Sequence, residues 1–188
     1  MKRLKTTLSI VFLLSVSASV LSQKSDGTDG TILLGLHYGF ILKGPDGWLI
    51  DSSAARPEGL EAVLYREGSS WKNAVAVMYV RVIYKNEMQA TVEKVISNDV
   101  SDFLKQSRET KAWESPNLAT RDKKQAVVKG FYDAPNKNHE LVAFIDEPKV
   151  VVILVLSSRD KDEFEKSLPA FKALVGSYFF VKELVDPR

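Results

Sequence analysis

The sequence has no cysteine and only two histidines among its 188 residues. The lack of cysteine excludes disulfide bonds, thiolate zinc sites, thiol nucleophiles and the acylated cysteine that a bacterial lipoprotein carries. The two histidines, His37 and His139, allow a serine, histidine and acid triad in principle, but no Gly-x-Ser-x-Gly nucleophile motif accompanies them. His37 lies beside Tyr38 in an apolar segment, where we expect a hydrogen-bonded structural histidine. A hydrolase is therefore the least favoured functional class, and we expect a protein that is not an enzyme.

The sequence also lacks an apolar run of about 20 residues, which a membrane-spanning helix needs. Its first apolar stretch, residues 8–21, is short and contains four serines. Three cations among the first five residues precede this stretch, and small residues follow it. The pattern predicts a secretory signal peptide over residues 1–22, cleaved between Ser22 and Gln23, and hence a periplasmic or secreted protein. An uncleaved membrane anchor is the alternative, and it would be the only expected contact with a membrane.

No surplus of basic charge remains once the signal peptide is removed. Three of the 26 Lys and Arg residues lie in residues 1–22, so 23 basic residues face 24 acidic ones in the mature chain. A net charge of −1 argues against a nucleic-acid partner. The remaining length suits one domain, which we expect over residues 32–181, after a flexible lead-in at 23–31 and before a C-terminal tail at 182–188.

Extended segments alternate with strong turn signals along this domain. Strands are predicted over residues 32–42, 48–50, 60–65, 74–84, 124–132, 141–145 and 150–156. The turn at residues 44–47 predicts a hairpin between the first two segments, and the turn at residues 146–149 predicts another between the last two. The segments at 74–84 and 150–156 carry apolar residues on both faces, so we expect both faces of the sheet to be covered.

Two segments have the spacing of amphipathic helices. Apolar residues recur every three or four positions from Val92 to Leu104. A second helix is predicted to begin near Asp160, with Glu163 at capping-box spacing, and to kink or restart at Pro169. This order of elements predicts an α+β fold, mainly an antiparallel β-sheet covered by helices in a three-layer α/β/α sandwich.

Two motifs resemble a known superfamily. The first is the strand Gly39–Lys43 running into Pro45-Asp46-Gly47-Trp48; the second is the pattern Ser157-Ser158, Phe164, Leu168-Pro169, Phe171, Val175 and Ser177-Tyr178-Phe179. Both are similar to the PsbP/DcrB-like superfamily, which groups the photosystem accessory protein PsbP, the envelope protein DcrB and a Ran-binding import factor. The resemblance implies a PsbP-like sandwich. Because known members are mostly non-catalytic accessory or binding proteins, it also implies an interaction role, and we expect no cofactor.

Three groups of residues are candidates for a binding site. Asp133, His139 and Glu140 flank one hairpin loop and offer oxygen and nitrogen ligands to a divalent cation, although a solvated turn explains the same residues. Trp71 and Trp113 lie in polar stretches and are candidate interface anchors, whereas Trp48 is expected in the core.

The third group is Phe103 and Phe131, which would line a pocket between sheet and helix. The preferred interpretation is an exported, soluble accessory or scaffold protein that binds another envelope protein. A periplasmic carrier of a small ligand or metal is the alternative.

Overall fold

The computed structural model of the protein describes residues 30–85 and 91–181. These residues form ten strands, three α-helices and one 3-10 helix. The strands are β1 (Thr31–Gly35), β2 (Tyr38–Leu42), β3 (Trp48–Asp51), β4 (Ala62–Arg66), β5 (Ala76–Tyr84), β6 (Lys111–Ala119), β7 (Gln125–Asp133), β8 (Asn138–Asp146), β9 (Val150–Ser158) and β10 (Phe179–Phe180). The helices are α1 (Ser52–Ala55), η1 (Arg56–Glu58), α3 (Val92–Leu104) and α4 (Lys161–Ser177).

Seven strands form one antiparallel sheet in the order β3-β4-β5-β9-β8-β7-β6. Strand β9 lies at its centre, and its side chains alternate between two cores: Val152 and Leu154 pack on one face, Val151 and Ile153 on the other. The predictions of an antiparallel sheet and of two covered faces are therefore confirmed. A smaller antiparallel sheet has the order β1-β2-β10.

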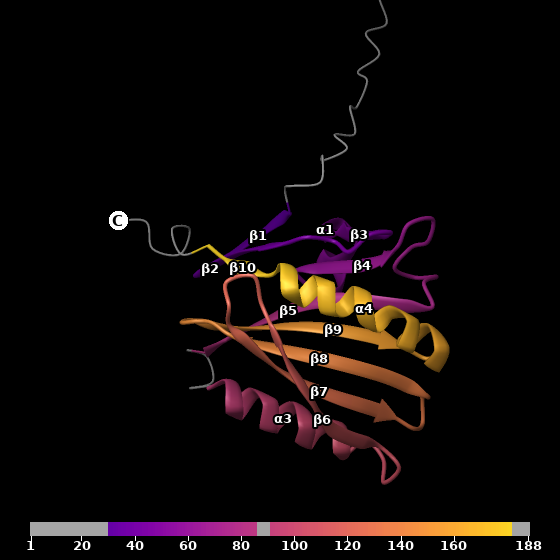
Figure 1. Cartoon of the computed structure of the whole chain (residues 1–188). Coiled ribbons are helices and arrows are strands. Elements are labelled where there is room, and N and C mark those ends of the chain that lie inside the picture. The colour runs from indigo at the N-terminus through magenta and orange to yellow at the C-terminus, as the bar shows by residue number, and fades with distance from the viewer. Residues whose placement is uncertain (1–29, 86–90, 182–188) are drawn as a thin grey trace, which may run out of the picture.

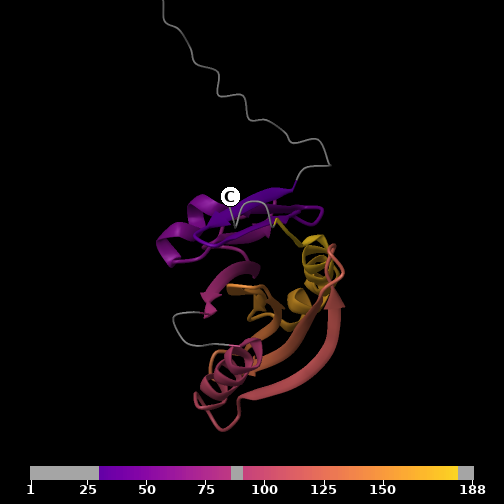
Figure 2. The ribbon, with the colours of Figure 1, turned by 90° about the vertical axis from the view of Figure 1, so that its left-hand side faces the viewer.

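Different layers cover the two faces of the large sheet. Helix α3 packs on one face, and α4 together with the small sheet packs on the other (Figure 1). Strand β6 spans both layers: Ala112 packs in the α3 core and Leu118 in the α4 core, with a β-bulge between them (Figure 2). The predicted three-layer sandwich is confirmed, with the small sheet as an addition to the α4 layer.

The two long helices are held very differently. Helix α4 begins at its cap Asp160, whose carboxylate accepts a hydrogen bond from the backbone N–H of Glu163 at 2.9 Å. It buries five residues and continues through Pro169, so the predicted restart does not occur. In contrast, α3 buries only Val95 fully, although its apolar stripe is as long as predicted. Much of the apolar surface of α3 is therefore left for other contacts.

The predicted first hairpin is wrong. Residues 32–42 do not form one strand; they fold back at Leu36 and His37 into the pair β1 and β2, and β3 pairs with β4 in the other sheet. His37 has a φ of 72° and is exposed in that turn, so it is not the structural histidine expected in a strand. A turn with positive φ at a residue other than glycine gives little signal in the sequence.

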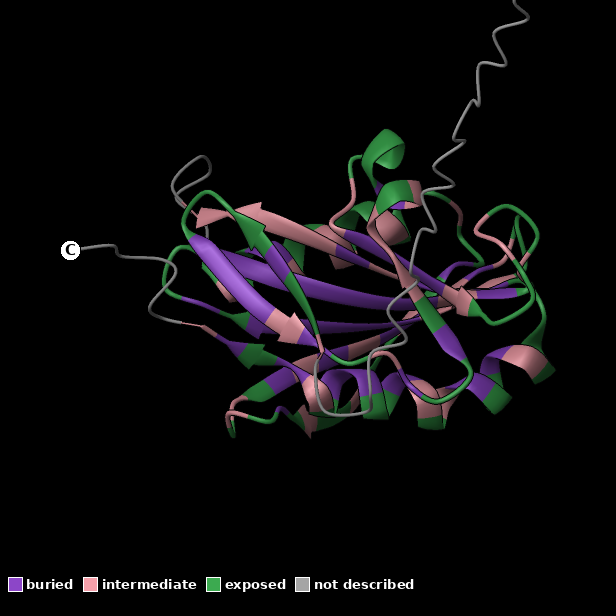
Figure 3. Cartoon of the chain, turned by 90° about the horizontal axis from the view of Figure 1, so that it is seen from above, coloured by how far each residue is buried: buried purple, intermediate pink, exposed green. Residues whose placement is uncertain are grey.

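The small sheet leaves apolar side chains in solvent. In Figure 3, which looks down on this sheet, β2 is almost entirely buried and β1 almost entirely exposed. Ile32, Leu34 and Leu36 are 54%, 60% and 71% exposed, and Phe179 is 38% exposed. Exposed apolar side chains gathered on one small sheet form a surface capable of protein contact.

The predicted signal peptide, nearly all of the lead-in and the C-terminal tail lie outside the described residues. Within residues 30–85 and 91–181, no helix has the length and apolar character needed to cross a membrane.

Replacing Ser167 with alanine is expected to raise the free energy of unfolding by about 1 kcal/mol. The hydroxyl of Ser167 is buried in α4, and no group of the described residues forms a hydrogen bond with it. Ser177→Ala is the matched control, because Ser177 Oγ donates to the carbonyl of Leu174 at 2.7 Å and accepts from the N–H of Lys43 at 3.0 Å. Urea unfolding should show stabilisation for the first variant and destabilisation for the second; equal effects would contradict the prediction.

Candidate functional site

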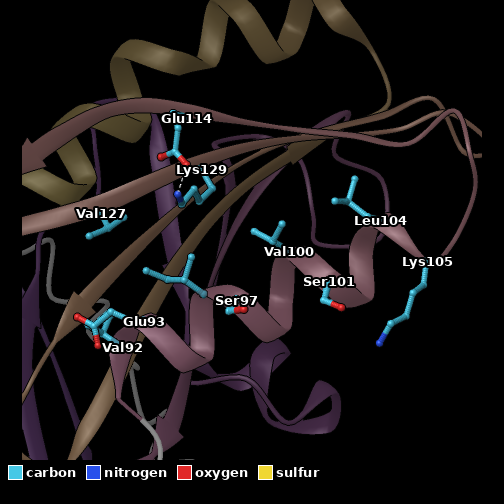
Figure 4. Close-up of a pocket in the computed structure, with 11 residues that line it drawn as sticks. Val92, Glu93, Ser97, Val100, Ser101, Leu104, Lys105, Glu114, Val127 and Lys129 are labelled. Atoms are coloured by element: carbon cyan, nitrogen blue, oxygen red, sulfur yellow. Dashed lines mark hydrogen bonds and ion pairs between the residues drawn. The ribbon is translucent and has the colours of Figure 1, made fainter.

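A groove runs along α3, between the helix and strands β6 and β7. We call it the α3 groove; it has a volume of about 880 Å³ and is lined by Val92, Glu93, Ile96, Ser97, Val100, Ser101, Leu104, Lys105, Glu114, Val127 and Lys129. Figure 4 shows α3 on one side, with Val100 and Leu104 turned to the space, and the ion pair of Glu114 and Lys129 above it on the strands.

The groove is open because α3 has a wider apolar stripe than the sheet covers. Val92, Ile96 and Val100 are half-buried, and Leu104 is 44% exposed. Strand β6 has a bulge between Ser115 and Leu118, and its apolar contacts pass there from the α3 core, at Ala112, to the α4 core, at Leu118. The result is an apolar floor with charged residues at the rim.

Charged residues at the rim of the groove form ion pairs with other residues of the protein. Lys129 forms an ion pair with Glu114, and its side chain is 15% exposed while that of Glu114 is 80% exposed. At the C-terminal end of α3, the ammonium of Lys105 donates to Asp102 Oδ1 at 2.9 Å. These exposed pairs contribute little to stability and instead mark the border of the apolar floor.

A second hollow, of about 200 Å³, lies on the opposite side of α3. Phe103 and Phe131 both line it, and their ring centroids are 4.7 Å apart. The structure thus brings the two predicted pocket residues together, but in this smaller hollow and not in the α3 groove. Arg81 of β5 forms an ion pair with Asp99 of α3 in the same hollow. Burial raises the pKa of Asp99 above its ordinary value, and the Arg81 guanidinium opposes that shift.

The three candidate metal ligands are not brought together. His139 and Glu140 are neighbours on β8 and point to opposite faces of the sheet: His139 contacts the rings of Tyr132 and Phe164, whereas Glu140 lines the small hollow. Asp133 is buried at the end of β7. Among the described residues, no cluster of three or more His, Asp or Glu side chains has the arrangement of a metal site.

The carboxylate of Glu140 instead belongs to a hydrogen-bond network. Its Oε1 accepts from Asn138 Nδ2 at 2.9 Å and from Ser157 Oγ at 3.1 Å. Burial raises the pKa of Glu140, while these two hydrogen bonds and the charge of Arg81 oppose the shift and the charge of Asp133 adds to it. Neither the network nor its position is visible in the sequence, because Asn138 and Ser157 lie on different strands.

The two candidate tryptophans lie on different faces. Trp71, half-buried in the loop before β5, meets Tyr79 edge-on with ring centroids 6.3 Å apart, on the α3 side. Trp113 is 43% exposed on β6 and covers Gly130 on the other side, where an added Cβ would lie 2.1 Å from the indole. Trp48 is buried as predicted. The two tryptophans therefore cannot belong to one contact surface.

The residues of the α3 groove were missed as a site because their spacing predicts a buried stripe. Only the position of β6 reveals the groove, and the polar sequence of this strand gives no strand signal. The exposed side of β6 explains the missing apolar alternation.

Comparison with known proteins gives structural similarities only. No protein-family model and no curated protein sequence matches the chain. The solution structure of cyanobacterial PsbP (CyanoP) from Synechocystis sp. PCC 6803 is similar, with a TM-score of 0.50 and 12% identity over 86% of this chain and 99% of that chain. The crystal structure of LpqN, involved in cell envelope biogenesis of Mycobacterium tuberculosis, has a TM-score of 0.50 and 14% identity over 83% of this chain and 87% of that chain. The chain therefore has the PsbP-like fold, as the resemblance of its sequence to the PsbP/DcrB-like superfamily implied.

Proposed function

We propose that this protein is an exported, non-catalytic accessory protein of the cell envelope, and that the α3 groove binds an apolar segment of a partner envelope protein. The observation that carries the proposal is the open apolar floor of the groove. Five of its eleven lining residues are apolar, namely Val92, Ile96, Val100, Leu104 and Val127, and none of these five is fully buried. The predicted signal peptide supports the envelope location, and LpqN offers an analogy in its described involvement in cell envelope biogenesis.

The openness of the groove favours a protein segment over a small ligand. A small-molecule site buries most of its ligand, typically about 70–90% of the ligand surface. A ligand lying between Val100 and Val127 would remain open to water along the exposed side of α3. A partner protein covers both its own segment and the groove, because the rest of the partner excludes water from the contact.

A site-specific crosslink tests the proposal. A photoreactive amino acid in place of Ser97, which is exposed in the groove, is expected to give one dominant protein adduct in cells that make the protein. Adding Leu104→Glu should lower the adduct yield about tenfold, because it places a charge on the apolar floor. Leu36→Glu, a matched change at a residue 71% exposed on the small sheet, should leave the yield unchanged.

Two results would contradict the proposal. An adduct that forms equally well with Leu104→Glu does not depend on the groove. Loss of the adduct with Leu36→Glu alone would place the interface on the small sheet. Circular dichroism of both variants checks that the fold is retained.

A small-ligand carrier is the second candidate function. The volume of about 880 Å³ falls within the range of ligand pockets and favours this alternative. Native mass spectrometry of protein purified without denaturant would then show a reproducible added mass, and Val100→Trp, which fills the groove, would remove it. A bare protein mass that is the same for both forms counts against a carrier.

A further inference from the structure

A third hollow lies on the same face of the large sheet as α3, at the end of β9 that leads into α4. We call it the Trp71 hollow; its volume is about 570 Å³. Trp71 forms one wall, Asn138 and Ser157 line it from β8 and β9, and Lys72 and Arg159 are exposed at its border. The α3 groove shares no lining residue with it.

The polar side of the hollow is held in a fixed orientation. Asn138 Nδ2 donates to Ser157 Oγ at 3.0 Å and to Glu140 Oε1 at 2.9 Å. The Ser157 hydroxyl lies 3.1 Å from both Glu140 Oε1 and Asn138 Oδ1, either of which accepts its proton. An amide, a hydroxyl and a carboxylate are thus arranged side by side, with acceptor capacity remaining.

The aromatic wall is held as well. The indole of Trp71 meets the ring of Tyr79 at an interplanar angle of 82°, and Tyr79 is itself half-buried on β5. This edge-to-face contact restricts the indole while leaving Trp71 only partly covered. A fixed, partly open indole beside fixed polar groups binds a ligand with little loss of side-chain entropy.

The charged residues that line the hollow are of both signs. Lys72 and Arg159 are positive, and Asp160 is negative. Mixed signs disfavour phosphates and other strongly charged ligands, which prefer sites of one sign. They favour a neutral molecule with many hydrogen-bonding groups.

We propose that the Trp71 hollow binds a neutral saccharide, with one pyranose ring against the indole of Trp71 and its hydroxyl groups on Asn138, Ser157 and Arg159. A pyranose ring has an apolar C–H face that suits an aromatic wall, and its hydroxyls both donate and accept hydrogen bonds. A guanidinium donates to such hydroxyls, and an amide and a serine hydroxyl both donate and accept. This site is independent of the proposed partner segment in the α3 groove.

Saturation-transfer NMR with maltose, cellobiose and N,N′-diacetylchitobiose tests the inference on the folded protein. At least one disaccharide is expected to bind with a Kd between about 0.1 and 10 mM, as suits an open site with few contacts. Trp71→Ala should weaken that binding at least about tenfold. Trp113→Ala is the matched control, because it removes a tryptophan from the opposite face of the sheet and should change nothing.

A second variant guards against misfolding of Trp71→Ala. Arg159 is exposed, so Arg159→Ala should keep the fold and still weaken binding about threefold or more. The inference fails if none of the three disaccharides gives a signal at about 20 mM. It also fails if Trp113→Ala weakens binding as much as Trp71→Ala, or if Arg159→Ala has no effect. If the photoreactive residue at position 97 gives no protein adduct while saccharide binding is unchanged, only the proposal for the α3 groove is overturned.

Discussion

Replacing Lys124 with methionine is expected to lower the free energy of unfolding by about 3 kcal/mol at about pH 8. The ammonium of Lys124 forms an ion pair with Glu147, whose side chain is 0% exposed, and Tyr178 donates its hydroxyl proton to Glu147 Oε1 at 3.0 Å. This carboxylate joins the turn between β8 and β9 to the start of β7 and the end of α4. Without Lys124, a buried negative charge is left with one hydrogen bond, and the nearby charge of Asp122 repels it.

The loss of stability in the Lys124→Met variant should depend strongly on pH. Burial already raises the pKa of Glu147 above the ordinary carboxyl value, and Lys124 is the main group that opposes the shift. Removing Lys124 raises that pKa further, so the folded state holds the proton more tightly than the unfolded state does. The stability of the variant therefore falls as the pH rises through the raised pKa, and most of the loss should disappear near pH 5.

A double variant separates charge from packing. Lys124→Met combined with Glu147→Gln should recover stability to within about 1 kcal/mol of the starting protein, because no buried charge remains. Lys149→Met, at an exposed lysine in the same turn, is the control and should have little effect. Urea unfolding at the two pH values measures all four proteins. A loss for Lys124→Met that is the same at both pH values would show that the buried charge is not the cause.

Phe171→Ala is expected to destabilise the protein by about 3–5 kcal/mol, whereas Val95→Ala should cost only about 1–2 kcal/mol. Phe171 is 0% exposed on α4, in the core between that helix and the centre of the large sheet, and its truncation leaves a large cavity. Val95 is 4% exposed and is the one fully buried residue of α3. The difference follows mainly from the larger volume removed at Phe171, and the open groove beside α3, into which neighbouring side chains can relax, adds to it.

Urea denaturation measures both effects, as a lower midpoint at an unchanged slope. Lys172→Ala, at the exposed residue next to Phe171, controls for changes in helix propensity. An equal loss for Val95→Ala and Phe171→Ala would mean that α3 is packed as tightly as α4. The open apolar floor that carries the proposed function would then be in doubt.

Residues that are close together in the sequence were enough to predict the elements whose signals are local. The stripe from Val92 to Leu104, the cap at Asp160 and the apolar run of β9 each depend on residues within a few positions of one another. The predicted turn at residues 146–149 is also confirmed, because Asp and Pro favour a turn regardless of what surrounds it. These features sufficed to predict an antiparallel α+β sandwich, and two weak motifs sufficed to indicate its fold.

The tertiary fold set the features that join distant residues. It divided residues 32–42 into β1 and β2, because the small sheet gains a third strand, β10, from the other end of the chain. It placed β6 at the edge of the large sheet, where exposure removes the apolar alternation by which a strand is predicted. This placement of β6 beside α3 forms the α3 groove. The tertiary fold also separated His139 from Glu140, since adjacent residues of a strand face opposite sides. Pairing between strands far apart in sequence depends on the whole fold, and no local spacing records it.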